Sequence, residues 1–174
     1  MKIGVISDTH RKVKKAKRAI DVLKEEGAEF IVHAGDIVEL EVLELLRDSG
    51  LRYVAVYGNN DVHLAEFHND FNLVQEPYFF KLSGLKFKLM HIPFYMLPDA
   101  DVVIFGHTHK AYVEYINSTL FLNSGEACAR DTSISRWSML EIKEKEFIVT
   151  NYSRANKSEN IEREVLKFLR ETNG

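Results

Sequence analysis

The N-terminal third of the chain alternates between apolar strands and amphipathic helices. Residues 2–7, 29–35 and 52–59 are short, mainly apolar segments of the length expected for buried strands. In 12–27 and 39–50 the apolar residues recur at helical spacing, and both segments end at a glycine. A β-α-β-α-β order requires parallel strands joined by right-handed crossovers, so the chain is restricted to an α/β fold.

After Pro77 the pattern changes to short strands with turn signals between them. Residues 78–91 predict a hairpin that turns at Ser83 and Gly84, and 101–106 predict another buried strand. Four further short strands are expected, at 111–117, 119–125, 136–144 and 146–153. The second half of the chain therefore contributes mainly strands.

The end of the chain is charged and amphipathic, and residues 158–172 are predicted to form a closing helix. The sequence contains no repeat, low-complexity run or linker, so residues 1–174 are expected to form one domain with its own core. The predicted architecture is an α/β sandwich. Two sheets pack face to face and helices flank them, in four layers α/β/β/α.

Charge and cysteine content restrict the class of partner. The formal net charge of −3 gives no general attraction to acidic membranes or to nucleic acid as a polymer. The single cysteine, Cys128, excludes an internal disulfide and fits a reducing compartment. The apolar run at the N-terminus is too short for a signal peptide or a spanning helix. We therefore expect a cytoplasmic protein without a membrane partner; the sequence is compatible with a homodimer but leaves the oligomeric state open.

Polar side chains collect directly after the predicted strands. In open α/β sheets, ligands bind at the carboxyl ends of the strands. Residues i and i+2 of extended chain point to the same side, so we expect Asp8 with His10, and His107 with His109, to form two same-side pairs. The candidate donors are Asp8, His10, Asp36, Asn59, His91, His107 and His109.

Two aspartates, one asparagine and four histidines are too many donors for one tetrahedral ion. They suit two divalent ions that share a carboxylate, and a donor set without thiolate favours Mn²⁺, Ni²⁺, Fe or Zn²⁺, with manganese or nickel preferred. A lone histidine at a strand end is more often structural, but five donor clusters at five strand ends favour a metal centre. Of the remaining histidines, His33 is interpreted as a core residue, and His63 and His68 as exposed. Cys128 is interpreted as a buried residue without a partner that would make it a nucleophile.

The ordered series DTH, GD, GNND, H and GHTH resembles the calcineurin-like metallophosphoesterase superfamily, whose pattern is D-x-H, G-D, G-N-H-D/E, H and G-H-x-H. The match runs from Ile3 to about Arg130, and the compact chain is similar to the small single-domain phosphodiesterase branch of that family. The resemblance implies the same two-sheet sandwich and a hydrolase with two divalent metal ions. It places one ion on Asp8, His10, Asp36 and His109, and the other on Asp36, Asn59, His91 and His107, with Asp36 as the bridge.

By this resemblance the chain is expected to hydrolyse small phosphate diesters by attack of a hydroxide that bridges the two ions. The candidate catalytic residues are Asn59, Asn60, His91 and Arg130. Asn60 stands where larger members keep a histidine that contacts substrate and can act as an acid. Because an amide cannot give up a proton, diesters with good leaving groups are the expected substrates.

Two further departures from the family concern the walls of the site. Only fifteen residues separate His91 from His107, which trims one wall of the pocket. The family's asparagine-proline-glycine-serine segment is NSGE here, so Glu126 would repel phosphate if it pointed inward, and Arg130 follows close behind.

Two other functions remain as alternatives. The fold also resembles the vacuolar-sorting subunit of the retromer, so the chain could be a metal-binding scaffold for protein interactions. A weak phosphomonoesterase is the second alternative. Retention of every metal donor favours an enzyme over a scaffold, because buried polar groups are costly to keep without a function. The sequence leaves the natural substrate and the physiological metal open.

Overall fold

The computed structural model describes residues 1–170. Its helices are α1 (Val13–Glu25), α2 (Leu40–Asp48) and the short 3₁₀ helix η1 (Val62–Phe67). Its strands are β1 (Lys2–Ile6), β2 (Phe30–His33), β3 (Arg52–Val56), β4 (Leu73–Val74), β5 (Tyr78–Leu82), β6 (Leu85–Leu89), β7 (Val102–Ile104), β8 (Ala111–Ile116), β9 (Thr119–Ser124), β10 (Ile134–Ile142), β11 (Glu146–Ala155) and β12 (Glu162–Leu169).

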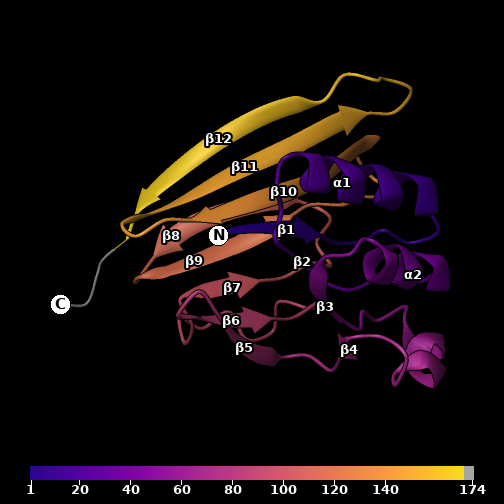
Figure 1. Ribbon diagram of the computed structural model, residues 1–174, viewed down its shortest axis with the longest axis horizontal. Coiled ribbons are helices and arrows are strands. Elements are labelled where there is room, and N and C mark those ends of the chain that lie inside the picture. Colours follow the sequence, from indigo (N-terminus) through magenta and orange to yellow (C-terminus); the bar gives the residue numbers. More distant parts are fainter. Residues whose placement is uncertain (171–174) are drawn as a thin grey trace.

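The strands form two sheets, and both α-helices lie over one of them (Figure 1). The seven-stranded sheet has the order β12-β11-β10-β1-β2-β3-β4, and the five-stranded sheet has the order β5-β6-β7-β9-β8. Strands β1, β2 and β3 pair in parallel, as the crossover pattern predicts, and β6, β7 and β9 do the same in the other sheet. The predicted two-sheet α/β sandwich and the hairpin of β5 and β6 are confirmed.

The core is divided by the seven-stranded sheet. Alternate residues of β1 point to its two faces, so Ile3 and Val5 pack between the sheets while Gly4 faces α1. A Cβ at Gly4 would lie 2.7 Å from the Cδ1 of Leu23, which shows how closely α1 approaches the strand. Both core clusters consist almost entirely of buried aliphatic and aromatic side chains. The two cores pack against both faces of the central strands.

The outer face of the five-stranded sheet is covered differently from the expected fourth layer. Within residues 1–170, no helix packs on this face. The irregular segment 92–99 lies there instead and contributes Met96 to a small cluster with Val103 and Phe121. The helical covering is therefore one-sided.

The predicted closing helix is wrong, because residues 162–169 form strand β12, antiparallel to β11; residues 171 and 172 lie outside the described part. Two patterns compete in this segment. Leu166 and Phe168 are two residues apart, and both pack against the core between the sheets. An uncovered edge of β11 would also leave a row of unpaired backbone groups. Pairing with that edge favours the strand over the helix.

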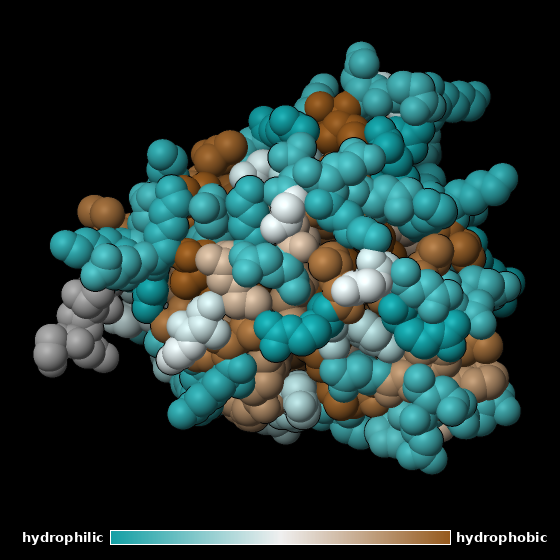
Figure 2. All heavy atoms as spheres, viewed as in Figure 1, coloured by the Kyte–Doolittle hydropathy of each residue, from teal (hydrophilic) through white to brown (hydrophobic). Residues whose placement is uncertain are grey.

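The surface seen in Figure 2 is covered mainly by hydrophilic side chains, with apolar ones scattered among them. Among the described helices, none combines the length and the apolar character needed to cross a membrane.

Candidate metal centre

The carboxyl ends of the parallel strands of both sheets meet at one place. Loop backbone joins them: the amide of Asp8, after β1, donates to Gly35 O (3.0 Å), and the amide of Gly106, after β7, donates to His91 O (3.1 Å). The two sheets are connected directly where the amide of His107 donates to Oδ2 of Asp8 (3.2 Å). All seven candidate donors project from these loops.

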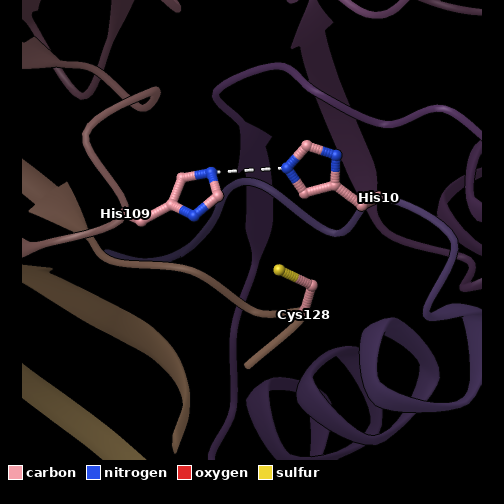
Figure 3. Close-up of side chains that lie close together, drawn as sticks. All are labelled: His10, His109 and Cys128. Atoms are coloured by element: carbon pink, nitrogen blue, oxygen red, sulfur yellow. Dashed lines mark hydrogen bonds between the residues drawn. The ribbon is translucent and has the colours of Figure 1, made fainter. Parts of the chain in front are cut away.

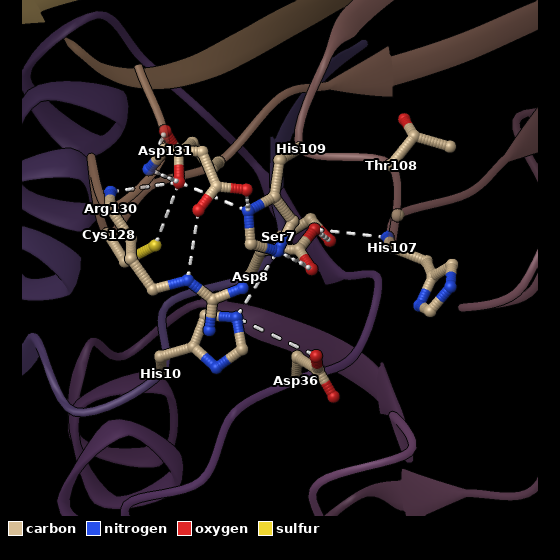
Figure 4. Close-up of polar contacts among 12 residues, drawn as sticks. Ser7, Asp8, His10, Asp36, His107, Thr108, His109, Cys128, Arg130 and Asp131 are labelled. Carbon is tan, nitrogen blue, oxygen red and sulfur yellow. Dashed lines mark hydrogen bonds and ion pairs between the residues drawn. The ribbon is translucent and has the colours of Figure 1, made fainter. Parts of the chain in front are cut away.

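Four of the donors form a first group. Ligand atoms of Asp8, His10, Asp36 and His109 all lie within 4.8 Å of one another, and all four residues are buried. The Nε2 of His109 is 3.3 Å from the Nε2 of His10 and 3.3 Å from Oδ1 of Asp8. The Nε2 of His10 is 3.6 Å from Oδ2 of Asp36. Figures 3 and 4 show the rings of His10 and His109 facing each other, from loops far apart in the sequence.

The other donors form a second group. The Oδ1 of Asn59 lies 3.0 Å from the Nε2 of His91 and 3.0 Å from the Nδ1 of His107. The two ring nitrogens are 3.3 Å apart. The Oδ1 of Asp36 lies 3.5 Å from the Nε2 of His91. Asp36 therefore presents one carboxylate oxygen to each group, which is the arrangement required of a bridging ligand.

Both groups fit divalent cations. In each, two imidazole nitrogens converge at a distance where at most one of them can carry the shared proton. Within the described residues Asp8 Oδ1 is buried and accepts no hydrogen bond, although His109 lies close to it. The opposite nitrogen of His91, Nδ1, donates to Ala34 O (2.8 Å) and so turns the lone pair of Nε2 toward the second group. Unpaired lone pairs of carboxylate, amide and imidazole are the donors that borderline divalent metals bind.

The backbone at most of the donor residues is not extended, contrary to the expectation from the sequence. Five of the seven donors have positive φ: Asp8 53°, His10 44°, Asp36 54°, His107 65° and His109 60°. The donors lie in tight turns just beyond the strands. The premise that extended chain turns residues i and i+2 to the same side is therefore wrong here. Asp8 and His10 belong to one group, and His107 and His109 belong to different groups, which is the grouping that the family resemblance implied. A left-handed conformation costs about 1–2 kcal/mol for each such residue, and the interactions at the site must offset this.

The glycines before these donors permit close approach. Gly35 has a φ of 85°, and a Cβ there would lie 2.7 Å from the Nδ1 of His91. At Gly58 a Cβ would lie 2.1 Å from the backbone nitrogen of Asp36. Any side chain at either position would push apart the loops that carry the donors.

The electrostatics favour bound positive charge. Burial alone would raise the pKa of Asp36, but the hydrogen bond and charge of His91, and then the hydrogen bonds from Asn60, hold it well below its ordinary value. Burial lowers the pKa of His91 and interactions with Asp36 outweigh it, so the pKa is raised. The close approach of the Asp8 carboxylate raises the pKa of His109. The pKa of His10 is lowered, chiefly by burial. Asp36 therefore stays ionised and attracts either protons or cations to the imidazoles beside it.

Asn60 and Arg130, the two other candidate catalytic residues, border the same site. The backbone amide of Asn60 donates to Oδ1 of Asp36 (3.0 Å), and its side-chain Nδ2 donates to Oδ2 (2.8 Å). Arg130 is exposed, and its Nε donates to Oδ1 of Asp131 (3.1 Å). Both line a cavity of about 510 Å³ that opens beside His10. The structure brings all the candidate residues together. It also shows the hydrogen bonds from Asn60 to Asp36, which the sequence did not indicate.

Two buried carboxylates hold the loops of the site and were missed as functional residues. Asp61 accepts the backbone amides of Ile37 (3.0 Å), Val38 (2.8 Å) and Gly58 (2.7 Å). Glu126 accepts the amides of residues 130, 131 and 132, so it does not face the cavity as a repulsive charge. These hydrogen bonds, with the Cys128 thiol and the Thr132 hydroxyl, overcome burial and lower the pKa of Glu126 to about 2. The only sequence signal was the position of each residue inside a motif, GNND and NSGE.

The remaining histidines behave as expected. His33 is fully buried, and its Nε2 lies 3.0 Å from the Thr9 hydroxyl; burial lowers its pKa to about 3. His63 and His68 are exposed. These three interpretations are confirmed.

Cys128 is buried as expected, but it lies closer to the site than the sequence indicated. Its sulfur is within 4.8 Å of ligand nitrogens of His10 and His109. Figure 3 shows the Cys128 side chain beside the two rings. The thiol donates to Oε2 of Glu126 (3.2 Å), and burial together with this bond raises its pKa to about 12. It therefore remains a neutral thiol beside the nitrogen and oxygen donors.

A two-sheet α/β sandwich with two donor groups sharing one carboxylate at the strand ends defines a metal-dependent hydrolase. The chain belongs to the calcineurin-like phosphoesterase superfamily, whose domain model matches residues 1–146. The family implies divalent metal ions, and the chain is a hydrolase of phosphate esters.

Individual relatives agree with this family. The phosphodiesterase MJ0936 of Methanocaldococcus jannaschii is 31% identical over 84% of this chain and 96% of its own length. A solved archaeal phosphodiesterase is similar with a TM-score of 0.75 and 28% identity, covering 95% of this chain and 100% of that one. A single mutant of Vps29 from Entamoeba histolytica has a TM-score of 0.78 at 23% identity, covering 97% and 99% of the two chains, which shows likeness of fold alone.

Proposed function

We propose that the chain is a phosphodiesterase that acts on small phosphodiesters with two divalent ions. Asp8, His10, Asp36 and His109 would hold one ion, and Asp36, Asn59, His91 and His107 the other. When bound, the ions would lower the pKa of a water molecule and neutralise charge on the phosphate. The observation that carries the proposal is that Asp36 turns one oxygen to each group of donors.

Two neighbouring residues would orient the bridging carboxylate and bind the phosphate of the substrate. Asn60 holds both oxygens of Asp36 in place through two hydrogen bonds. As an amide it cannot protonate a leaving group, which supports diesters with good leaving groups as the better substrates. Arg130 lies at the rim with its guanidinium exposed, and it would contact a phosphate oxygen of the substrate.

Further features of the proposal rest on the same observations. Donors without thiolate support Mn²⁺ or Ni²⁺ as the most effective ions. One seven-stranded sheet contains both β1 and β12, which supports a single domain. The single cysteine, Cys128, is buried and forms no disulfide, which supports a cytoplasmic location.

The test combines metal content with turnover. Protein stripped with chelator is reloaded with Mn²⁺, Ni²⁺, Fe²⁺ or Zn²⁺, and each sample is assayed with bis(p-nitrophenyl) phosphate and p-nitrophenyl phosphate. We expect two ions per chain by elemental analysis and faster turnover of the diester. Two bound ions without turnover of any phosphate ester would support the interaction scaffold instead. One ion or none would refute the assignment of the donors.

A further inference from the structure

The cavity beside His10 is strongly basic. Arg11, Lys12 and Arg130 line it, together with His10 and Asn60, and no carboxylate is among its lining residues. We call this cavity the basic pocket. The chain as a whole carries a formal net charge of −3, so three cations around one cavity are a local excess of positive charge. A substrate held at the metal centre would extend into this space.

The cations of the basic pocket are incompletely neutralised. The nearest partner of Arg11 is Glu39, at 3.8 Å from its Nε, and the side chain of Arg11 is 84% exposed. Within the described residues Lys12 makes no ion pair. Asp131 accepts from Arg130 through Oδ1, but its Oδ2 lies 2.9 Å from the Nδ1 of His109 and shares its charge with that ring. An anion in the pocket would therefore meet positive charge that is still available.

The start of α1 adds to the positive electrostatic potential near the basic pocket. The helix begins at Val13, immediately after Lys12, and its first turn contains no acidic residue. Its N-cap makes no side-chain hydrogen bond, and the positive end of the helix dipole follows directly after Arg11 and Lys12 in the chain. A carboxylate at this helix start would have neutralised this potential, and the sequence has none there.

We propose that the basic pocket binds a second phosphate group of the substrate, so that the preferred substrates are phosphodiesters that carry an additional phosphate near the scissile one. This inference rests on the proposed function. A cavity of about 510 Å³ has the size of a small-molecule site and can take a nucleotide-sized group. One more phosphate contacted by exposed cations should raise kcat/KM by about tenfold at low salt, and by less as salt screens the charges.

The test uses two diesters that differ by one phosphate: thymidine 5′-(p-nitrophenyl phosphate) and its 3′-phosphorylated form. The metal-loaded protein is compared with Arg11→Gln/Lys12→Gln. The control is Lys14→Gln/Lys17→Gln, which removes two exposed charges from α1, outside the pocket. We expect wild type and control to prefer the phosphorylated substrate, and the Arg11→Gln/Lys12→Gln variant to lose the preference while retaining turnover of the simpler diester.

A binding measurement separates this inference from the proposed function. Calorimetric titration with thymidine 3′,5′-bisphosphate and thymidine 5′-monophosphate needs no turnover. Tighter binding of the bisphosphate, beyond a twofold statistical factor and lost in Arg11→Gln/Lys12→Gln, supports the subsite even if neither diester is hydrolysed. Turnover of both diesters at equal kcat/KM with equal binding of the two nucleotides would overturn the subsite and leave the phosphodiesterase standing.

Discussion

Replacement of Asp61 by asparagine should destabilise the protein, although the side chain keeps its size. Asp61 is completely buried, and its two oxygens accept three backbone amides: Oδ2 those of Ile37 and Gly58, and Oδ1 that of Val38. An asparagine has one acceptor oxygen, so in its better orientation its NH₂ group would face the amide of Val38. One hydrogen bond to a carboxylate oxygen is lost, and two donors, the Val38 amide and the introduced NH₂ group, face each other without an acceptor.

The magnitude follows from these contacts. A hydrogen bond to a charged group contributes about 1.5–3 kcal/mol, and a buried donor left unsatisfied costs about 1–3 kcal/mol. We expect the free energy of unfolding to fall by about 3 kcal/mol. For a chain of this length, that corresponds to a decrease in Tm of about 6–12 °C.

The assay is urea and thermal unfolding of chelator-treated protein, since bound metal would add its own stabilisation. Asp70→Asn is the matched control, because Asp70 is exposed and belongs to the same connection between β3 and β4. Asp61 also holds the loops that carry Asp36 and Asn59, so the metal affinity of Asp61→Asn should fall by about 10–100-fold. A loss of stability no larger than that of the control would refute the account of Asp61 as the residue that holds these loops.

Three further predictions follow from the site. Asp36→Ala should lower activity more than any other single donor change, because both groups lose a carboxylate oxygen. If this variant keeps half the parent activity while His10→Ala abolishes it, Asp36 is not the bridging residue. Asn60→His should raise turnover of diesters with poor leaving groups by about tenfold and of aryl diesters by less, because an imidazole can donate a proton; equal effects on both would mean that position 60 only shapes the pocket. His33 has a folded-state pKa of about 3, below the unfolded value of about 6.5, so its contribution is present above pH 6.5 and is lost as the pH falls toward 3. Between these pH values the wild type should lose up to about 1.4 kcal/mol of stability per pH unit through this group. Urea unfolding of His33→Gln at pH 5 and 7 should show a smaller change of the free energy of unfolding with pH. An unchanged dependence on pH would contradict the assignment of a neutral buried ring.

Most of the fold and the gathering of the seven candidate donors at one edge could be predicted because their signals are local. The strands and helices up to β3 follow from apolar spacing and from glycine stops, and a parallel sheet brings the ends of its strands to one edge. Asp8, Asp36 and Asn59 were therefore identifiable as neighbours before any contact was known. The hairpin of β5 and β6 has an equally local signal at Ser83 and Gly84.

Other features depend on partners that are distant in the sequence. Residues 162–169 fit both helical and alternating patterns, and the free edge of β11 together with the core between the sheets selects the strand. The sorting of His107 and His109 into different groups depends on their left-handed turns and on donors contributed by the opposite sheet. The resemblance to the family implied this sorting, but the spacing of the two histidines alone did not.

The residue types and their order along the chain were sufficient to predict the α/β class and to place seven candidate metal donors at the strand ends, because these predictions depend on local spacing and ligand chemistry. The packing of the two sheets was required to assign one oxygen of Asp36 to each donor group, to show Asp61 as the residue that holds its loops, and to bring Arg11, Lys12 and Arg130 around one cavity. The physical reason is distance. These contacts join segments that meet only after the sheets have closed on each other, and their energies come from burial and geometry rather than from neighbours in the sequence.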